Sequence, residues 1–292
     1  MWTHAFSAMG TIWHLSVDSA SVSDACVQDI SAKTAAFEKR FSRFIADSEV
    51  SQWRNAQSGT YGISPEFATL LQFAQNLKIK SDGLFDPAVG SLLEHAGYDS
   101  GYSFNQNEAQ IASWQLPQWH LSGTKLTITG PLVFDLGGFA KGFWIDQVSA
   151  LLLTHQYPFH LVDGGGDMFA TTKASGEPWR IAIEYPGKTD TALGTVGLVN
   201  QGFAASDVFK RSWKDWHHLI NLSEKKPQAT VVGAVAVANT AMEADGMTAL
   251  LMLTQPEKYQ EYYKTSLDCE YLVLTPANQL YISPGWPGEV FT

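Results

Sequence analysis

The chain has 292 residues, of which 45% are hydrophobic and 16% charged, and its formal net charge is −10. These proportions are those of a folded protein with a substantial core, in one large domain or two intertwined ones. The negative balance excludes a broad nucleic-acid surface, because phosphate binding needs clustered Lys and Arg. No apolar run is long enough to span a membrane, and the start at Met1–His4 shows no signal peptide. The sequence therefore predicts a cytoplasmic protein, unless an export segment precedes it.

The two cysteines, Cys26 and Cys269, lie far apart in the sequence and lack the spacing of metal ligands. Two free thiols are the favoured interpretation, and one long-range disulfide is the alternative. Neither interpretation implies a metal centre.

In the first part of the chain, the hydrophobic pattern predicts one strand and two helices. Phe6–Val17 reads as a first strand, and Ser23–Phe41 has the apolar spacing of a helix. Ser64-Pro65-Glu66 predicts a helix start, with a capping hydroxyl, a proline in the first turn and an acid beside it. We expect that helix to run to about Ile79 and to end at Ser81-Asp82-Gly83.

The rest of the chain alternates strands and helices irregularly. The predicted strands are Leu126–Thr129, Leu132–Phe134, Phe159–Val162, Trp179–Ile183 and the apolar Val231–Ala238, with Tyr271–Thr275 and Leu280–Ile282 as a closing hairpin. The predicted helices are one that ends at Leu153 and one over Thr240–Leu253 with a Thr cap. This order favours an α+β fold over a doubly wound parallel sheet.

Two glycine-rich segments follow predicted strands. Asp135-Leu136-Gly137-Gly138-Phe139-Ala140-Lys141-Gly142 precedes a helix, where free backbone N–H groups bind anions such as phosphate. A tight strand–helix turn explains the same glycines equally well. Gly164-Gly165-Gly166-Asp167 suggests backbone packed under a flat ligand, although a turn at a strand end is the simpler explanation.

Two polar segments carry groups that suit catalysis. Asp245 and Thr248 lie one turn apart at the start of a predicted helix, and both are hard oxygen ligands suited to Mg²⁺. Capping of the helix start by acids is the simpler explanation. His217-His218-Leu219-Ile220 predicts a strand with one imidazole facing inward, which is either a hydrogen-bonded structural histidine or a proton acceptor.

Taken together and in this order, these segments resemble the FAD:protein FMN transferase family, also called ApbE. The resemblance covers nearly the whole chain. It is carried by the four segments above and by Ala8-Met9-Gly10-Thr11, Phe41-Ser42-Arg43-Phe44, Asp47–Ser51 with Asn55, Gly83-Leu84-Phe85-Asp86-Pro87-Ala88-Val89-Gly90 and Trp179–Pro186. The resemblance implies a single domain over 1–292, made of two intertwined α+β lobes with mixed or antiparallel sheets and an FAD groove between them.

The resemblance also implies an activity and a set of site residues. Such enzymes use Mg²⁺ to move FMN from FAD to a Thr or Ser hydroxyl of a target flavoprotein, with release of AMP. His218 falls on the catalytic histidine of the family, and Mg²⁺ is held by the Ala140 carbonyl and by Asp245. Thr248 is the candidate substitute for the usual Thr ligand, whose position is Ala249 here. The residues expected to line the FAD groove are Met9, Phe44, Leu84, Phe85, Asp86, Gly137, Phe143 and Ile220.

The sequence departs from the family pattern at several positions. Ala249 stands where the family has a Thr four residues after the metal Asp, and Asn221 replaces an Asp after the catalytic histidine. Ala205 and Val208 replace a Thr and an Asp in another motif. Two alternatives to the transferase therefore stay open: an FAD-binding protein without catalysis, and an FAD pyrophosphatase that forms FMN and AMP.

Overall fold

The computed structural model describes residues 1–261 and 268–291. The chain divides into two compact units, and each unit combines segments that are separated in the sequence. Unit 1 comprises the described residues of Met1–Glu38, Gly138–Lys210 and Ala229–Thr292, and unit 2 comprises Lys39–Gly137 and Arg211–Gln228. This interleaving and the antiparallel sheets confirm the predicted α+β class. The single domain expected over residues 1–292 stays a prediction.

The main sheet of unit 1 has eight strands in the order β1-β2-β6-β7-β10-β15-β16-β17, and each neighbouring pair is antiparallel. Its strands are β1 (Trp2–Ala8), β2 (Thr11–Val17), β6 (His160–Asp163), β7 (Met168–Ala170), β10 (Gln201–Asp207), β15 (Gly233–Ala238), β16 (Glu270–Leu274) and β17 (Leu280–Ile282). A second, three-stranded sheet has the order β18-β9-β8, built from β8 (Trp179–Tyr185), β9 (Lys188–Leu198) and β18 (Gly288–Val290).

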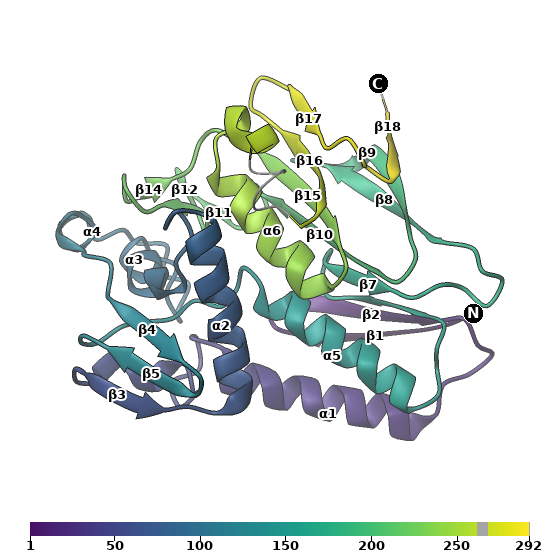
Figure 1. Cartoon of the computed structure of the whole chain (residues 1–292), viewed down its shortest axis with the longest axis horizontal. Coiled ribbons are helices and arrows are strands. Elements are labelled where there is room, and N and C mark those ends of the chain that lie inside the picture. The colour runs from purple at the N-terminus through teal and green to yellow at the C-terminus, as the bar shows by residue number, and fades with distance from the viewer. Residues whose placement is uncertain (262–267, 292) are drawn as a thin grey trace. The chain divides into compact units, whose positions relative to one another are not determined.

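Apolar side chains fill the space between these two sheets. The buried cluster includes Trp179, Ile183, Leu198, Phe203, Val235, Val237 and Leu272. The helices of unit 1 are α5 (Ala140–Thr154), α6 (Ala241–Leu253), the short η3 (Pro256–Lys258) and most of α1 (Asp24–Phe41). Helix α6 packs on β10 and β15, and α5 packs on α6, β6 and β7 (Figure 1). The main sheet is therefore the middle layer of unit 1, and α5 and α6 both pack on its strands.

Unit 2 has its own small sheet and short helices. The sheet has the antiparallel order β3-β5-β4, with β3 (Gly59–Gly62), β4 (Trp119–Ser122) and β5 (Lys125–Ile128). The helices are η1 (Ser51–Asn55), α2 (Pro65–Lys80), η2 (Pro87–Val89), α3 (Gly90–His95) and α4 (Glu108–Ser113). Two two-stranded pairs complete the unit: β11 (Ser212–Trp213) with β12 (Trp216–His217), and β13 (Ile220–Asn221) with β14 (Lys226–Pro227).

Local sequence signals determine several of these boundaries. The Ser64 side chain accepts from the Phe67 N–H at the start of α2, as the cap pattern predicts. Thr240 and Glu243 form a capping box at the start of α6. The β16–β17 hairpin is present, and no disulfide joins Cys26 to Cys269. Among the described residues, no helix combines the length and the apolar character needed to cross a membrane.

The prediction of one strand over Phe6–Val17 is wrong. The chain reverses at Met9-Gly10, with φ of 51° and 71°, so that β1 pairs with β2 as a hairpin. A two-residue turn with both φ values positive matches the twist of the flanking strands. The glycine allows one of these conformations easily, whereas Met9 adopts the left-handed region at a cost. The pattern concealed the turn because Met is not a typical turn residue.

The predicted strand Leu132–Phe134 is also absent. This segment is buried, but its backbone bonds go to separate loops and helices. The Leu132 N–H donates to the Trp53 carbonyl at 3.1 Å, and the Val133 carbonyl accepts from the Gly90 N–H at 3.1 Å. An apolar run predicts burial, but it does not say whether a neighbouring strand will supply a ladder.

His160 joins β6 to α5 inside unit 1. Its ring lies 2.7 Å from the Ser149 hydroxyl through Nε2 and 2.7 Å from the Tyr157 carbonyl through Nδ1, and the side chain is fully buried. Burial disfavours the imidazolium and lowers the pKa of His160 below 6.5, although the Tyr157 carbonyl partly opposes this shift. The unfolded chain therefore binds a proton at a pH where the folded protein does not.

This difference predicts how stability depends on pH. The contribution of His160 is fully present above pH ~6.5 and is lost as the pH falls from there through the lowered folded-state pKa. We expect His160→Gln to be less stable by about 1–3 kcal/mol at neutral pH, because Ser149 and Tyr157 lose their partner. The variant should lose less stability than the wild type between neutral pH and pH ~5.5. Urea unfolding at both pH values measures this, and equal losses would contradict it.

Candidate functional site

Two predicted metal ligands lie at neighbouring helix starts in unit 1. Ala140 is the first residue of α5, and Asp245 is the fifth residue of α6. The Gly142 N–H donates to Asp245 Oδ2 at 3.0 Å, and the Asp245 side chain is buried. The backbone of α5 therefore fixes the orientation of this carboxylate.

This contact depends on a close approach of the two helices. A Cβ atom added to Gly142 would lie 2.3 Å from the Ala241 carbonyl oxygen, so no other residue fits there without movement. Asp146, one turn further along α5, accepts from the N–H groups of Ala241 at 2.8 Å and Met242 at 3.0 Å. It thereby satisfies two of the free donors at the start of α6.

The surroundings of Asp146 are acidic as well as buried. Burial, with the nearby charges of Glu243 and Asp245, raises the pKa of Asp146 to about 6, against the effect of its two N–H donors. Several acids therefore lie together at the start of α6, where the free N–H groups partly stabilise their charge.

The donor set fits a hard cation. Among the described residues, no hydrogen bond uses Asp245 Oδ1, which leaves an oxygen available at the end of a fixed carboxylate. A carboxylate together with a backbone carbonyl is a donor pair that Mg²⁺ accepts, with the remaining positions filled by water or phosphate. No cluster of three or more His, Cys, Asp or Glu placed to hold a metal occurs in the described part of the chain. A cation here would therefore depend on substrate oxygens.

Thr248 lies beside this pair but is already engaged. Its hydroxyl donates to the Asp245 carbonyl at 2.8 Å and lies 2.8 Å from the Ser206 hydroxyl, and the residue is fully buried. Since Thr248 has one hydroxyl proton, Ser206 must be the donor between them. Thr248 as a metal ligand stays a prediction, and its contacts here tie α6 to β10.

The second glycine segment is a turn between β6 and β7. The N–H groups of Gly165 and Gly166 both donate to Asp163 Oδ1 at 2.8 Å. Asp167, which follows them, forms a buried ion pair with Lys141 in the first turn of α5. The two glycine segments thus meet through Lys141 and Asp167, a pairing that sequence analysis did not predict because nothing in the spacing connects them.

The predicted FAD contacts of unit 1 occupy exposed or half-buried positions. Met9 is half-buried at the turn of the β1–β2 hairpin. The ring of Phe143, on α5, is half-buried and stacks on Phe37 with centroids 5.8 Å apart. The contacts of Met9 and Phe143 with FAD therefore stay predictions.

In unit 2, Asp86 is engaged in fixing its own loop. Its Oδ1 accepts from the Ala88 N–H and from Trp119 Nε1, both at 2.9 Å, and its Oδ2 lies 2.7 Å from Lys78 Nζ. The side chain is buried and caps η2. We therefore read Asp86 as the residue that holds the predicted flavin-contact loop, with Leu84 half-buried and Phe85 buried beside it.

Phe44 and Gly137 are held by a common buried network in unit 2. Gly137 is exposed, and its N–H donates to Asp135 Oδ1 at 2.7 Å. Asp135 Oδ2 accepts from Arg43 Nε at 2.6 Å, and the Arg43 guanidinium lies 4.2 Å from the centre of the Phe44 ring. The structure thus connects two sequence motifs that are about ninety residues apart.

The prediction that His217–Ile220 forms one strand is wrong. Strand β12 ends at His217, and β13 begins at Ile220. His217 Nε2 lies 2.9 Å from the Gln228 carbonyl, which anchors this imidazole as a structural group. Ile220 is buried in an apolar cluster with Leu92, Trp213 and Trp216, so its side chain belongs to the core of unit 2. Its predicted contact with FAD stays a prediction.

His218 lies in the irregular connection between these strands. Its Nδ1 is buried and has no hydrogen-bond partner among the described residues. Burial and the charges of Arg211 and His217 lower the pKa of His218 to about 3, against the opposing charge of Asp135 and the Arg211 carbonyl. The ring is therefore neutral at physiological pH and has a nitrogen available to accept a proton.

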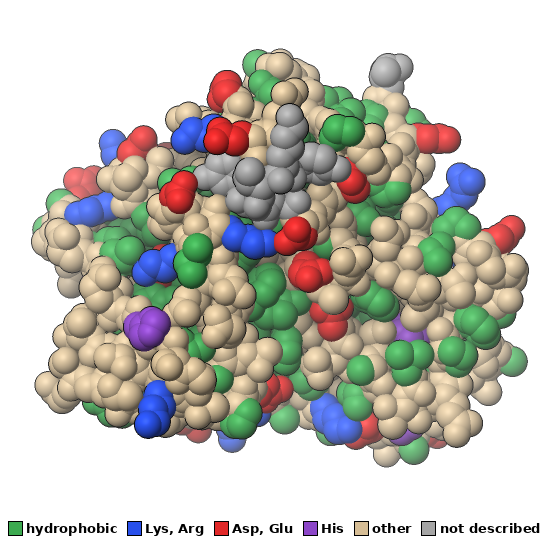
Figure 2. Space-filling model, in the orientation of Figure 1, with side chains coloured by type: hydrophobic (Ala, Val, Ile, Leu, Met, Phe, Trp, Pro, Cys, Tyr) green, Lys and Arg blue, Asp and Glu red, His purple; other side chains and the backbone are tan. Residues whose placement is uncertain are grey.

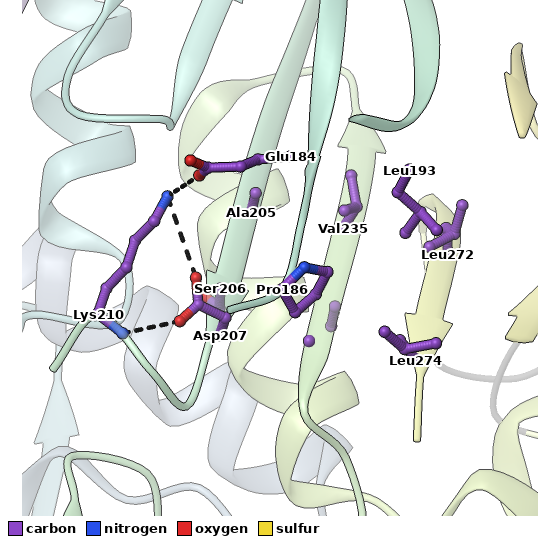
Figure 3. Close-up of a pocket in the computed structure, with 12 residues that line it drawn as sticks. Glu184, Pro186, Leu193, Ala205, Ser206, Asp207, Lys210, Val235, Leu272 and Leu274 are labelled. Carbon is purple, nitrogen blue, oxygen red and sulfur yellow. Dashed lines mark hydrogen bonds and ion pairs between the residues drawn. The ribbon is translucent and has the colours of Figure 1, made fainter. Parts of the chain in front are cut away.

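A separate pocket opens in unit 1 (Figure 3). Its apolar part is lined by Pro186, Leu193, Val235, Leu272 and Leu274. At its rim, Lys210 Nζ lies 2.5 Å from Glu184 and 4.0 Å from Asp207. None of the predicted site residues lines it, although Ala205 and Ser206 do. On the face shown in Figure 2, Lys and Arg side chains lie singly among acidic ones, in keeping with the negative net charge.

Unit 1 thus contains two neighbouring helix starts with a fixed carboxylate, and unit 2 contains a neutral histidine in an irregular connection. The model of the ApbE family matches residues 9–273, so the chain belongs to the ApbE family. The FAD:protein FMN transferase of Haemophilus influenzae is 28% identical over 305 residues, covering 92% of this chain and 85% of that protein.

Two solved structures share this fold. The ApbE protein of Thermotoga maritima superposes with a TM-score of 0.86 at 20% identity, over 97% of each chain. The flavin transferase ApbE of Vibrio cholerae superposes with a TM-score of 0.84 at 21% identity, also over 97% of each chain. At this identity the likeness establishes the fold alone.

The close approach at Gly142 generates a testable prediction. Gly142→Ala places a methyl group 2.3 Å from the Ala241 carbonyl oxygen, so α5 and α6 must separate. We expect a loss of about 1–3 kcal/mol in the free energy of unfolding. Gly130→Ala is the matched control, since a Cβ there meets nothing within 4 Å. Thermal unfolding of both variants measures the difference, and two equal melting temperatures would contradict the packing constraint.

Proposed function

We propose that this protein is an Mg²⁺-dependent FAD:protein FMN transferase, which moves FMN from FAD to a Thr or Ser hydroxyl of a target flavoprotein and releases AMP. The observation that carries the proposal is the buried Asp245 carboxylate, oriented by the Gly142 N–H with one oxygen left available beside the start of α5. Membership of the ApbE family and the name of the Haemophilus influenzae relative support it.

The proposed reaction exchanges one phosphorus–oxygen bond for another. The acceptor hydroxyl oxygen bonds to the phosphorus of the FMN half, the pyrophosphate bond to the AMP half breaks, and AMP leaves with the electron pair. Asp245 and the Ala140 carbonyl would hold Mg²⁺, which would supply charge neutralisation on the pyrophosphate. His218 takes the proton of the acceptor hydroxyl, which its neutral ring allows.

The low pKa of His218 belongs to the protein without substrate. A pyrophosphate brings negative charge, which favours the protonated imidazole and raises this pKa toward the range useful for a base. His218 is therefore available as an acceptor before FAD binds and becomes a stronger one in the complex. The same arrangement would serve a pyrophosphatase, with water in place of the protein hydroxyl.

The positions that depart from the family pattern favour a second candidate, an FAD-binding protein without catalysis. One of these changes preserves its local structure. Asn221 Oδ1 accepts from the Ser223 N–H at 3.1 Å and the Ser223 hydroxyl at 2.7 Å, the turn that an Asp would also form. Ala249 is buried within α6, where a Thr hydroxyl would need a partner. Release of AMP separates the two candidates.

Replacement of His218 tests the proposed base. We expect His218→Ala to lower the rate of AMP release by roughly 10²–10⁴-fold, because general-base help is lost. FAD affinity should change much less, since the proton moves only in the transition state. His217→Ala is the control: it loses the bond to the Gln228 carbonyl and about 0.5–1.5 kcal/mol of stability, but it keeps most of the activity.

The pH profile supplies a further readout of the same residue. Because kcat/KM reports the free enzyme, its acid limb from His218 should lie well below the ordinary histidine pKa of ~6.5. Equal AMP release by His218→Ala and the wild type would remove His218 from the mechanism.

Replacement of Asp245 tests the proposed metal site. Asp245→Asn keeps an oxygen to accept from the Gly142 N–H but removes the negative charge. We expect AMP release to require a higher Mg²⁺ concentration and to fall by roughly 10–100-fold at a fixed low concentration. Glu243→Gln removes a charge from the same helix while preserving the capping box, and should stay close to the wild type. The same Mg²⁺ dependence in both variants would refute the assignment.

A further inference from the structure

The buried Arg43 in unit 2 combines contacts to acids with contacts to aromatic rings. Its side chain is 3% exposed, and it is paired with Asp135 at 2.6 Å and with Glu94 at 3.3 Å. Its Nη2 is buried and lacks a hydrogen-bond partner among the described residues. Removing a charge from water is expensive, and an apolar side chain of similar volume is often as stable or more so. The contacts that an apolar group could not make are therefore the ones that point to a role for this guanidinium.

The contacts of Arg43 reach two predicted flavin-binding elements at once. The guanidinium lies over the rings of Phe44 and Tyr98, 4.2 Å and 5.0 Å from their centres. The same guanidinium holds Asp135, whose other oxygen accepts from the Gly137 N–H at 2.7 Å. A planar, permanently charged group can stack on an aromatic face and fork to a carboxylate together, which a lysine cannot.

The acids around Arg43 are themselves fixed. Glu94 accepts from Arg54 through both oxygens, at 2.7 Å and 2.5 Å. Arg54 therefore orients the carboxylate that pairs with Arg43. Burial would raise the pKa of Asp135, but the Arg43 charge and the Gly137 N–H outweigh it and hold this pKa below its ordinary value. Arg54, Glu94, Arg43 and Asp135 therefore form a continuous chain of ion pairs.

We propose that Arg43 is a positioning residue that holds the Phe44 ring and the Gly137 turn in a fixed relation, so that both meet FAD without rearrangement. This role rests on the proposed function and assigns part of FAD affinity to a side chain that is itself buried. A preorganised site loses less conformational entropy on binding, so the effect should appear in affinity for FAD more than in the chemical step.

Arg40 provides a matched control within the same unit. It also pairs with two acids, Glu49 and Glu66, and its guanidinium lies 4.6 Å from the centre of the Phe41 ring. Its side chain is 42% exposed, and its contacts reach no predicted flavin-binding residue. Arg40→Lys therefore removes the same kinds of contact without touching the proposed positioning role.

The experiment compares Arg43→Lys with Arg40→Lys in the full chain. Flavin fluorescence gives the Kd for FAD, AMP release with Mg²⁺ gives KM and kcat, and thermal unfolding gives Tm. For Arg43→Lys we expect Kd and KM for FAD to rise by roughly 5- to 30-fold, with kcat changed by much less. For Arg40→Lys we expect both to stay at the wild-type value, even where Tm falls as far as in Arg43→Lys.

Arg43→Met is a second variant, which removes the charge and keeps a side chain of similar length. If Arg43→Met fails to fold, Arg43→Lys alone still decides the test. A wild-type Kd and KM in Arg43→Lys, or an equal rise in Arg40→Lys, would overturn the positioning role while leaving the proposed function intact. A wild-type protein that binds no FAD would overturn both. Binding of FAD without AMP release would remove the transferase only, and the Kd comparison would still decide the role of Arg43.

Discussion

The candidate metal site depends on one packing constraint, the approach of α5 to α6 at Gly142. Without a Cβ at this position, the backbone of α5 comes close enough for the Gly142 N–H to bind Asp245. Asp146 then closes the same junction by accepting from the first two N–H groups of α6. Protein interiors are close-packed, so a change of one methyl group here has nowhere to relax without moving a helix start. The orientation of the carboxylate is therefore a consequence of helix packing.

In unit 2, the aromatic and polar groups of the predicted site lie on connections between the helices and strands. Its connections carry buried charges in place of strand ladders, and each charge fixes a loop: Asp86 holds its own turn, and Asp135 holds Gly137. Buried charges of this kind tolerate little misplacement, since an unpaired one is costly. The network thus provides local rigidity where binding groups must sit on loops.

The sequence predicted the parts of the fold that follow from local chemistry. The Ser64 cap, the start of α6 at Thr240 and the closing β16–β17 hairpin are determined by residues within a few positions of each other. One error was local, at the Met9-Gly10 turn, and the other two involve distant partners. Leu132–Phe134 is buried without a neighbouring strand, and His217 ends its strand with its imidazole at the Gln228 carbonyl. A period of two cannot reveal either outcome.

The candidate site also combines features that the sequence could predict with features that it could not. Ala140 and Asp245, the predicted metal ligands, lie in motifs that resemble the ApbE pattern, and the structure places them at neighbouring helix starts, although their binding of Mg²⁺ stays a prediction. The pairing of Lys141 with Asp167, and the link from Arg43 through Asp135 to Gly137, could not be predicted. Each joins segments that only the folded chain brings together, and no spacing rule relates them.

In the proposed reaction, FAD is a substrate from which the FMN half is transferred. The most direct measurement incubates the wild-type protein with FAD, Mg²⁺ and a candidate flavoprotein acceptor, and quantifies AMP together with flavin bound covalently to that acceptor. We expect one AMP for each flavin attached, at a Thr or Ser of the acceptor, and no reaction when FMN replaces FAD. FAD that is bound and recovered intact, with neither AMP nor attached flavin, would contradict it.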